Sequence, residues 1–228
     1  MATRTEFLKQ LKDMEALIMR FGEKSAADVR AAGLAATGDA GADAGIIEGR
    51  KAAERLRTQI EGICLDTMLL QQPLVGEDLR FVSATFRIVS DLAQIDSMTR
   101  DVAFIYSEMP ADAPTELGGN FQAMADRAAA MVEGAVAAFV GSDTVQARAV
   151  IDADDELDRL YTACEQEVVD LIKGGQGTAA SLPELLMVAK YFERIGDKAQ
   201  RVADWTFFRV SGERILSYGD APSGSEEA

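Results

Sequence analysis

The sequence predicts an all-α protein of six helices, and three observations support this prediction. Apolar residues recur at steps of three and four, which is one face of an amphipathic helix, as in Phe7, Leu11, Met14, Ile18 and Phe21. Leucine, alanine, glutamate and methionine are abundant, whereas runs of alternating β-branched residues are absent. Glycines and prolines gather in short intervals between the periodic segments, where helices are expected to end.

Three helices are predicted in the first half of the chain, at residues 4–36, 44–71 and 77–108. Glycines follow the first of them, Pro73 follows the second and Pro110 follows the third. The third helix carries a heptad-like apolar seam, formed by Phe81, Ile88, Leu92, Ile95 and Val102.

Three more helices are predicted in the second half, at residues 115–141, 143–173 and 181–217. Gly141 separates the first two, and Gly174 begins the gap before the last. The last helix carries a matching seam, formed by Val188, Phe192, Ile195, Ala199 and Val202. Residues 219–228 are small and polar, and they are predicted to be a disordered tail.

The two halves form an internal repeat. A shift of 104 residues, or of 100 after the shorter fifth gap, aligns similar residues: Asp39 with Asp143, Ile47 with Ile151, Ile95 with Ile195, and Val102 with Val202. Two tandem three-helix bundles explain this pattern, with limits at 1–110 and 111–218. One continuous six-helix array is the alternative.

Composition excludes several classes of site. The 228 residues include 38 Asp and Glu, 23 Lys and Arg, and no histidine, for a net charge of −15. A Ser-His-Asp triad, a Cys-His pair and a His-ligated zinc or haem site therefore cannot form within the chain. The acidic balance argues against a nucleic-acid partner. Any bound metal is expected to have oxygen ligands, which hard cations prefer.

The chain is expected to act in the reducing cytoplasm without membrane insertion. Cys64 and Cys164 form no disulfide framework and lie on apolar helical stretches, so inert buried thiols are predicted. Residues 1–22 lack the uninterrupted apolar core of a signal peptide, and no run of about 20 apolar residues occurs.

Acidic residues recur at helical spacing in the second half. Glu193 and Asp197 are four residues apart, Asp204 follows seven residues later, and all three fall within roughly 40° of one another on the helix. Asp154 and Asp158 form a second pair on the preceding helix. Like charges at this spacing repel, so a bound cation would stabilise them if the two pairs face each other. A solvated acidic face is the alternative.

Gly196 lies between these acids, inside the last predicted helix. A mid-helix glycine costs about 1 kcal/mol relative to alanine. The apolar seam lies about 160° from the acidic stripe, so the stripe is predicted to face outward. An exposed Gly196 would then mark a place where another group approaches the backbone closely.

The string Phe192-Glu193-Arg194-Ile195-Gly196-Asp197-Lys198-Ala199 resembles the signature of the PhoU family of phosphate-signalling regulators. Gln72-Pro73 followed by Asp78-Leu79-Arg80-Phe81-Val82 resembles the start of that family's third helix. The likeness covers about residues 5–215, including the tandem repeat. It implies a cytosolic regulator, not an enzyme, that modulates the ATPase subunit of the high-affinity phosphate transporter and restrains a phosphate-sensing histidine kinase. A homodimer is expected.

Some members of this family bind multinuclear iron or other metals through Glu/Asp-x-x-x-Asp motifs on each bundle. The resemblance therefore implies carboxylate metal ligands in the second half, at Asp154, Asp158, Glu193, Asp197 and Asp204. Iron, manganese, magnesium and calcium all suit such ligands. The first half departs from the motif, since the repeat places these residues opposite the five acids, in the same order: Arg50, Glu54, Ala93, Ser97 and Phe104. The first-half site is expected to be lost, although Asp91, Asp96 and Asp101 leave a rearranged site as an alternative.

Basic residues replace the acids on the second predicted helix, at Arg50, Lys51, Arg55 and Arg57. They form either an ordinary surface that pairs with neighbouring glutamates or an anion-binding or partner-docking patch. For the whole chain, a metal-dependent phosphohydrolase and a metal-free helical scaffold are the alternatives to a regulator.

Overall fold

The computed structural model describes residues 4–35, 42–71, 73–109, 118–175 and 181–216. They form helices with no strand among them, in this order: α1 (Arg4–Ala35), α2 (Ala42–Glu48), α3 (Arg50–Leu70), α4 (Gly76–Ser107), α5 (Gly118–Gly141), α6 (Thr144–Asp152), α7 (Asp154–Lys173) and α8 (Ser181–Ser211). The all-α prediction is confirmed. The boundary between the two predicted bundles, at residues 110 and 111, lies outside the described residues. The predicted disordered tail, residues 219–228, lies outside them as well.

Two of the six predicted helices are each divided in two. The predicted helix 44–71 is interrupted at Gly49 and becomes α2 and α3, and the predicted helix 143–173 is interrupted at Ala153 and becomes α6 and α7. Both residues keep right-handed helical dihedral angles, with φ of −64° at Gly49 and −68° at Ala153. The interruptions stand at positions 49 and 153, which the 104-residue shift relates, so the repeat extends to this detail of the backbone.

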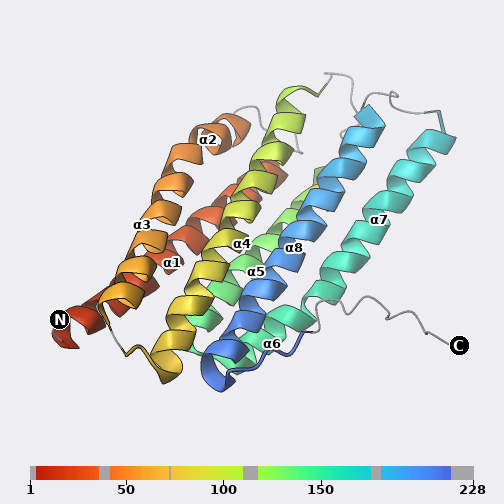
Figure 1. Cartoon of the computed structure of the whole chain (residues 1–228). Helices are drawn as coiled ribbons and strands as arrows, with labels where there is room; N and C mark the ends of the chain where they lie inside the picture. Colours follow the sequence, from red (N-terminus) through yellow and green to blue (C-terminus); the bar gives the residue numbers. More distant parts are fainter. Residues whose placement is uncertain (1–3, 36–41, 72, 110–117, 176–180, 217–228) are drawn as a thin grey trace, which may run out of the picture.

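The long helices lie side by side, with α3 and α7 on opposite sides of the molecule (Figure 1). The most extensive packing joins α1 to α5, α5 to α8, and α4 to α8, whereas α3 lies on α1 and α4, and α7 lies on α8 and α5. One cluster of buried side chains spans both halves and includes Phe21, Ile88, Phe139 and Phe192. The two three-helix repeats therefore share a single hydrophobic core.

Small residues allow α1 and α5 to approach closely. A Cβ atom added to Gly22 would lie 2.8 Å from Val136 Cγ2, and one added to Gly33 would lie 2.5 Å from Ala125 Cβ. Both distances are shorter than real Cβ contacts, so larger side chains at these glycines would push the two halves apart.

Arg209 of α8 ties the repeats together at one end of the molecule. Its guanidinium donates to the backbone oxygens of Phe139, at 2.7 Å, and Val140, at 3.1 Å, and it lies 3.2 Å from a Glu15 carboxylate oxygen. The same group stacks 4.3 Å from the centre of the Phe81 ring. One side chain thus contacts α1, α4 and α5.

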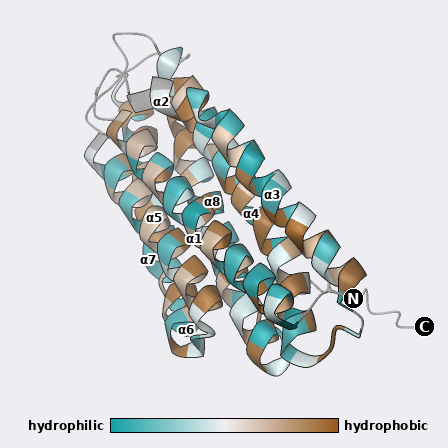
Figure 2. Ribbon diagram, turned by 90° about the vertical axis from the view of Figure 1, so that its left-hand side faces the viewer, coloured by the Kyte–Doolittle hydropathy of each residue, from teal (hydrophilic) through white to brown (hydrophobic). Residues whose placement is uncertain are grey.

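Within the described residues, no helix is long and apolar enough to cross a membrane. Cys64 and Cys164 are free and buried, as predicted. Burial raises the pKa of both thiols to about 12, so both are neutral near pH 7. In Figure 2, hydrophilic residues dominate the outward side of α3, and hydrophobic residues appear at its end near the N-terminus.

Candidate functional site

Four of the five predicted ligands meet on one face of α7 and α8. Asp154 is the first residue of α7 and Asp158 lies one turn later, while Glu193 and Asp197 lie one turn apart on α8. The charges of Asp158, Asp197 and Glu193 all act on Asp154. The two i, i+4 pairs therefore lie close enough for their charges to interact, and we refer to the four as the α7–α8 carboxylates.

The α7–α8 carboxylates repel one another. The pKa of Asp154 is raised from 3.8 to about 7, first by burial and then by the charges of Asp158, Asp197 and Glu193. The pKa of Asp197 is also raised, by burial and then by Glu193. Near neutral pH the face therefore holds more negative charge than its surroundings stabilise.

Lys190 supplies a nearby positive charge. Its Nζ atom lies 2.8 Å from Glu193 Oε2, one turn before Glu193 on α8. The hydrogen bond to Glu193 is the largest cause that raises the lysine pKa. The same ammonium lies 5.2 Å from the centre of the Tyr161 ring on α7. A cation that uses Glu193 as a ligand would have to displace this lysine.

Gly196 is buried, so the prediction of an exposed glycine is wrong. A Cβ atom there would overlap Leu157 Cδ2 of α7 and would lie 3.3 Å from Asp154 Oδ1. The group that approaches the backbone is therefore Leu157 of the same chain. This contact brings the start of α7 against α8 and sets the spacing of the carboxylates.

Asp204 does not join the other four acids. It is fully buried and accepts hydrogen bonds from Arg214 Nε at 2.7 Å and from the backbone N–H groups of Ile215, at 2.8 Å, and Leu216, at 3.2 Å. The chain after α8 folds back over this side chain, which the angular calculation did not include. Its observed role is to hold residues 214–216 against α8.

The donor set suits a hard cation, but the carboxylates do not converge on one point. All four donors are carboxylates, the ligands that Mg²⁺, Ca²⁺ and Mn²⁺ prefer. Within the described parts of the chain, however, no three His, Cys, Asp or Glu side chains are placed to hold a metal ion together.

Two of the three first-half acids that left a rearranged site as an alternative, Asp91 and Asp96, are paired with basic side chains. Asp91 lies 3.4 Å from Lys198 Nζ and 3.6 Å from an Arg201 nitrogen. Asp96 lies 3.2 Å from Lys24 Nζ and 3.1 Å from Arg100 Nε. Sequence periodicity did not reveal these pairs, because three of the four basic partners lie on another helix, far along the chain from their acid. The remaining acid of this group, Asp101, is exposed.

The repeat positions opposite the α7–α8 carboxylates carry a different chemistry. Arg50, Glu54, Ala93 and Ser97 line a hollow of about 190 Å³ between α3 and α4. Phe104, opposite Asp204, is exposed. Three arginines and two acids contribute to this hollow, so the equivalent place in the first half is not an all-carboxylate face.

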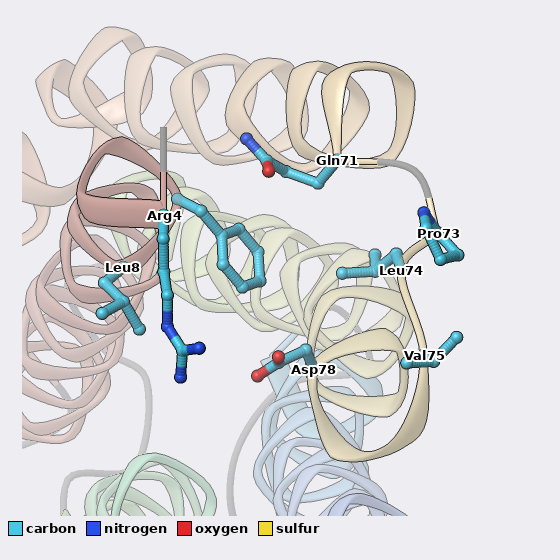
Figure 3. A pocket seen from close by; sticks show the side chains of 8 residues that line it. Arg4, Leu8, Gln71, Pro73, Leu74, Val75 and Asp78 are labelled. Atoms are coloured by element: carbon cyan, nitrogen blue, oxygen red, sulfur yellow. The ribbon is translucent and has the colours of Figure 1, made fainter. Parts of the chain in front are cut away.

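A second surface feature lies where α1, α3 and α4 meet, at the segment that precedes α4. A pocket of about 430 Å³ is lined there by Arg4, Phe7, Leu8, Gln71, Pro73, Leu74, Val75 and Asp78 (Figure 3). Leu69 and Val75 are 68% and 64% exposed, and Leu8 and Leu70 are also exposed. We refer to Leu8, Leu69, Leu70 and Val75 as the apolar end. The sequence pattern did not single out these residues, because helical periodicity alone does not show which apolar side chains stay uncovered.

Comparisons with known proteins agree on one family. Residues 121–206, which include all four α7–α8 carboxylates, match the PhoU domain family model. The phosphate-specific transport system accessory protein PhoU homolog of Aquifex aeolicus is 30% identical over 149 residues, or 65% of this chain and 67% of that protein. The homolog of the same description from Caulobacter vibrioides is 29% identical over 175 residues, or 75% of each chain.

A solved structure has the same fold. The crystal structure of the phosphate transport system regulatory protein PhoU from Streptococcus pneumoniae matches with a TM-score of 0.83. The match covers 92% of this chain and 100% of that chain, at 21% identity. At this level of identity the likeness extends to the fold alone.

Proposed function

The chain belongs to the PhoU family, and we propose from this that it is a non-enzymatic regulator of phosphate transport and phosphate signalling. In this role it binds the ATPase subunit of a phosphate ABC transporter and a phosphate-sensing histidine kinase. It acts as a homodimer in the cytoplasm, where these partners bring it to the inner face of the membrane.

The apolar end is the observation that carries this function. Leu69, Leu70 and Val75 are large apolar side chains that face solvent close to one another in the chain, beside a pocket of about 430 Å³. Contiguous exposed apolar surface on a folded protein is typical of sites where other proteins bind. Polar side chains at its edge, Arg4 and Asp78, would fix the orientation of a partner (Figure 3).

Binding assays with the purified ATPase subunit and the kinase test this function. Leu69→Glu and Val75→Glu place charge within the apolar end and should abolish capture of at least one partner. Val145→Glu is the matched control, because Val145 is 80% exposed on α6 and outside this surface. Equal capture by all three variants would exclude the apolar end as the docking surface, and no capture of either partner by the unaltered chain would refute the function.

A bound cation at the α7–α8 carboxylates is the second part of the function. It would relieve the repulsion that raises the pKa of Asp154 and Asp197, and it would compete with Lys190 for Glu193. Iron, manganese, magnesium and calcium are the candidates, acting as structural ions or as modulators of partner affinity. Asp204 is left out of this ligand set because its oxygens already accept three hydrogen bonds.

Metal content per chain tests the cation. After purification without chelators, a double variant with Asp158→Ala and Asp197→Ala should lose the metal, whereas Asp204→Asn should keep it. Full metal content in the double variant would remove these carboxylates as ligands. A phosphatase assay in iron or manganese separates the regulator from a metal-dependent hydrolase, since sustained turnover is expected only of the hydrolase.

A further inference from the structure

The hollow between α3 and α4 is rich in arginine, although the chain as a whole carries a net charge of −15. Its polar lining combines three arginines, two acids and one hydroxyl: Arg50, Arg57, Arg100, Glu54, Asp96 and Ser97. Its volume is about 190 Å³, which is small for an organic ligand. The size and the lining suit a compact polar ligand.

An exchange of side-chain size between the repeats creates this hollow. In the second repeat, Leu157 packs directly against Gly196 and fills the space between α7 and α8. The 104- and 100-residue shifts place Ala53 opposite Leu157 and Asp96 opposite Gly196. Because Ala53 is small, it leaves space between α3 and α4. Asp96, which is almost fully buried, lines that space.

Asp96, one of the two acids of the hollow, is offset by basic neighbours. Asp96 is paired with both Lys24, at 3.2 Å, and Arg100, at 3.1 Å. Arg57 lines the hollow and donates from its Nε atom to Glu61, at 2.9 Å. Arg50 is exposed, and within the described parts of the chain its guanidinium has no ion pair.

The start of α3 adds to the positive potential at the hollow. The helix begins with Arg50 and Lys51 and has no acidic residue in its first turn, and the residue before it is Gly49, which has no side chain that could cap it. Its counterpart α7 begins with Asp154, Asp155 and Glu156. Since a helix N-terminus carries partial positive charge, two basic residues there are unfavourable unless an anion is near.

We propose that this hollow binds one compact tetrahedral oxyanion, such as inorganic phosphate. The guanidinium groups of Arg50, Arg57 and Arg100 would hold its oxygens, because their planar arrays of N–H donors match oxyanions. The Ser97 hydroxyl supplies a further donor.

Glu54 at the same hollow gives selectivity. A carboxylate repels an anion but accepts a hydrogen bond from one that carries a proton. Hydrogen phosphate carries such a proton near neutral pH, whereas sulfate does not. The hollow should therefore favour phosphate over sulfate, and Glu54→Gln should strengthen sulfate binding.

Equilibrium dialysis of the full chain against radiolabelled phosphate, in low salt with EDTA, tests this site. We expect one phosphate per chain and about five-fold or greater weakening in Arg50→Gln. Arg55→Gln is the matched control, since Arg55 is an exposed arginine of α3 that does not line the hollow. It should bind phosphate like the unaltered chain.

Two measurements keep the test independent of folding and of the proposed function. Circular dichroism verifies that Arg50→Gln is folded, and the expected gain of sulfate binding in Glu54→Gln cannot arise from misfolding. Absence of phosphate binding at millimolar concentration, equal losses in Arg50→Gln and Arg55→Gln, or no sulfate gain in Glu54→Gln would each overturn the oxyanion site. Because no partner and no metal are present, these outcomes are separate from failure of partner binding.

Discussion

Replacing Asp154 with asparagine should stabilise the metal-free protein at pH 8. The pKa of Asp154 is raised from 3.8 to about 7 because the side chain is partly buried and faces Asp158, Asp197 and Glu193. The folded state therefore holds its proton to higher pH than the unfolded chain does. The stability that this proton provides is lost as the pH rises from about 4 to about 7. Asparagine has no charge to lose, so its advantage is full above pH 7.

The magnitude follows from the same pKa. A rise from 3.8 to about 7 corresponds to about 4 kcal/mol between the two protonation states. Solvent screening at a half-buried side chain reduces this to about 1–2 kcal/mol. The substitution would also remove a favourable interaction of about 0.5 kcal/mol between the carboxylate and the start of α7. The expected net gain at pH 8 is about 1 kcal/mol.

Urea unfolding in EDTA at pH 8 and pH 5 measures this gain. Asp154→Asn should raise the free energy of unfolding at pH 8 and have a smaller effect at pH 5. Glu165→Gln is the control, because it removes one negative charge from an exposed position of the same helix. A gain that is larger at pH 5, or equal in the two variants, would show that the repulsion at the α7–α8 carboxylates is not its cause.

Three further outcomes can be measured. Gly196→Ala should lower the free energy of unfolding by about 0–2 kcal/mol, because overlap of its Cβ with Leu157 costs about 1–3 kcal/mol and alanine gains about 1 kcal/mol of helix propensity; a clear rise of the urea midpoint would contradict that contact. Asp204→Asn should lower the free energy of unfolding by about 3 kcal/mol, because it breaks a buried pair with Arg214; an unchanged free energy of unfolding would show that the Asp204 carboxylate does not stabilise the fold. Cys64 and Cys164 should react with a thiol reagent only in denaturant, since burial raises the pKa of both to about 12; rapid labelling of the native chain at pH 8 would argue against their burial.

Helical periodicity and glycine or proline punctuation were sufficient to predict the fold, but they missed the interruptions at Gly49 and Ala153. Alanine strongly favours helix, so Ala153 carries no local signal of a break. Both residues keep helical dihedral angles. The interruptions stand at matching positions of the two repeats, so the comparison of the two halves relates them although the local propensity of Ala153 does not.

The candidate site was predictable where its geometry is local. The i, i+4 spacing was enough to place Asp154 with Asp158 and Glu193 with Asp197. It failed at Asp204, because the segment that covers this side chain follows the end of α8 and makes contacts that helical angles do not contain. It failed at Gly196 for a related reason, since the covering group belongs to another helix.

The two repeats differ where α3 meets α4 and α7 meets α8, at Ala53 and Leu157 of the shared apolar core. Leucine against glycine in one repeat becomes alanine against aspartate in the other, so bulk moves from the shorter helix to the longer one. The buried Asp96 that results requires cations, and Lys24 and Arg100 supply them. The second repeat has no acid at position 196, and Lys190 pairs with Glu193 of the α7–α8 carboxylates. Both repeats thus place polar residues between a pair of helices. Where aspartate replaces glycine, basic side chains gather around it, and where glycine stays, the carboxylates dominate.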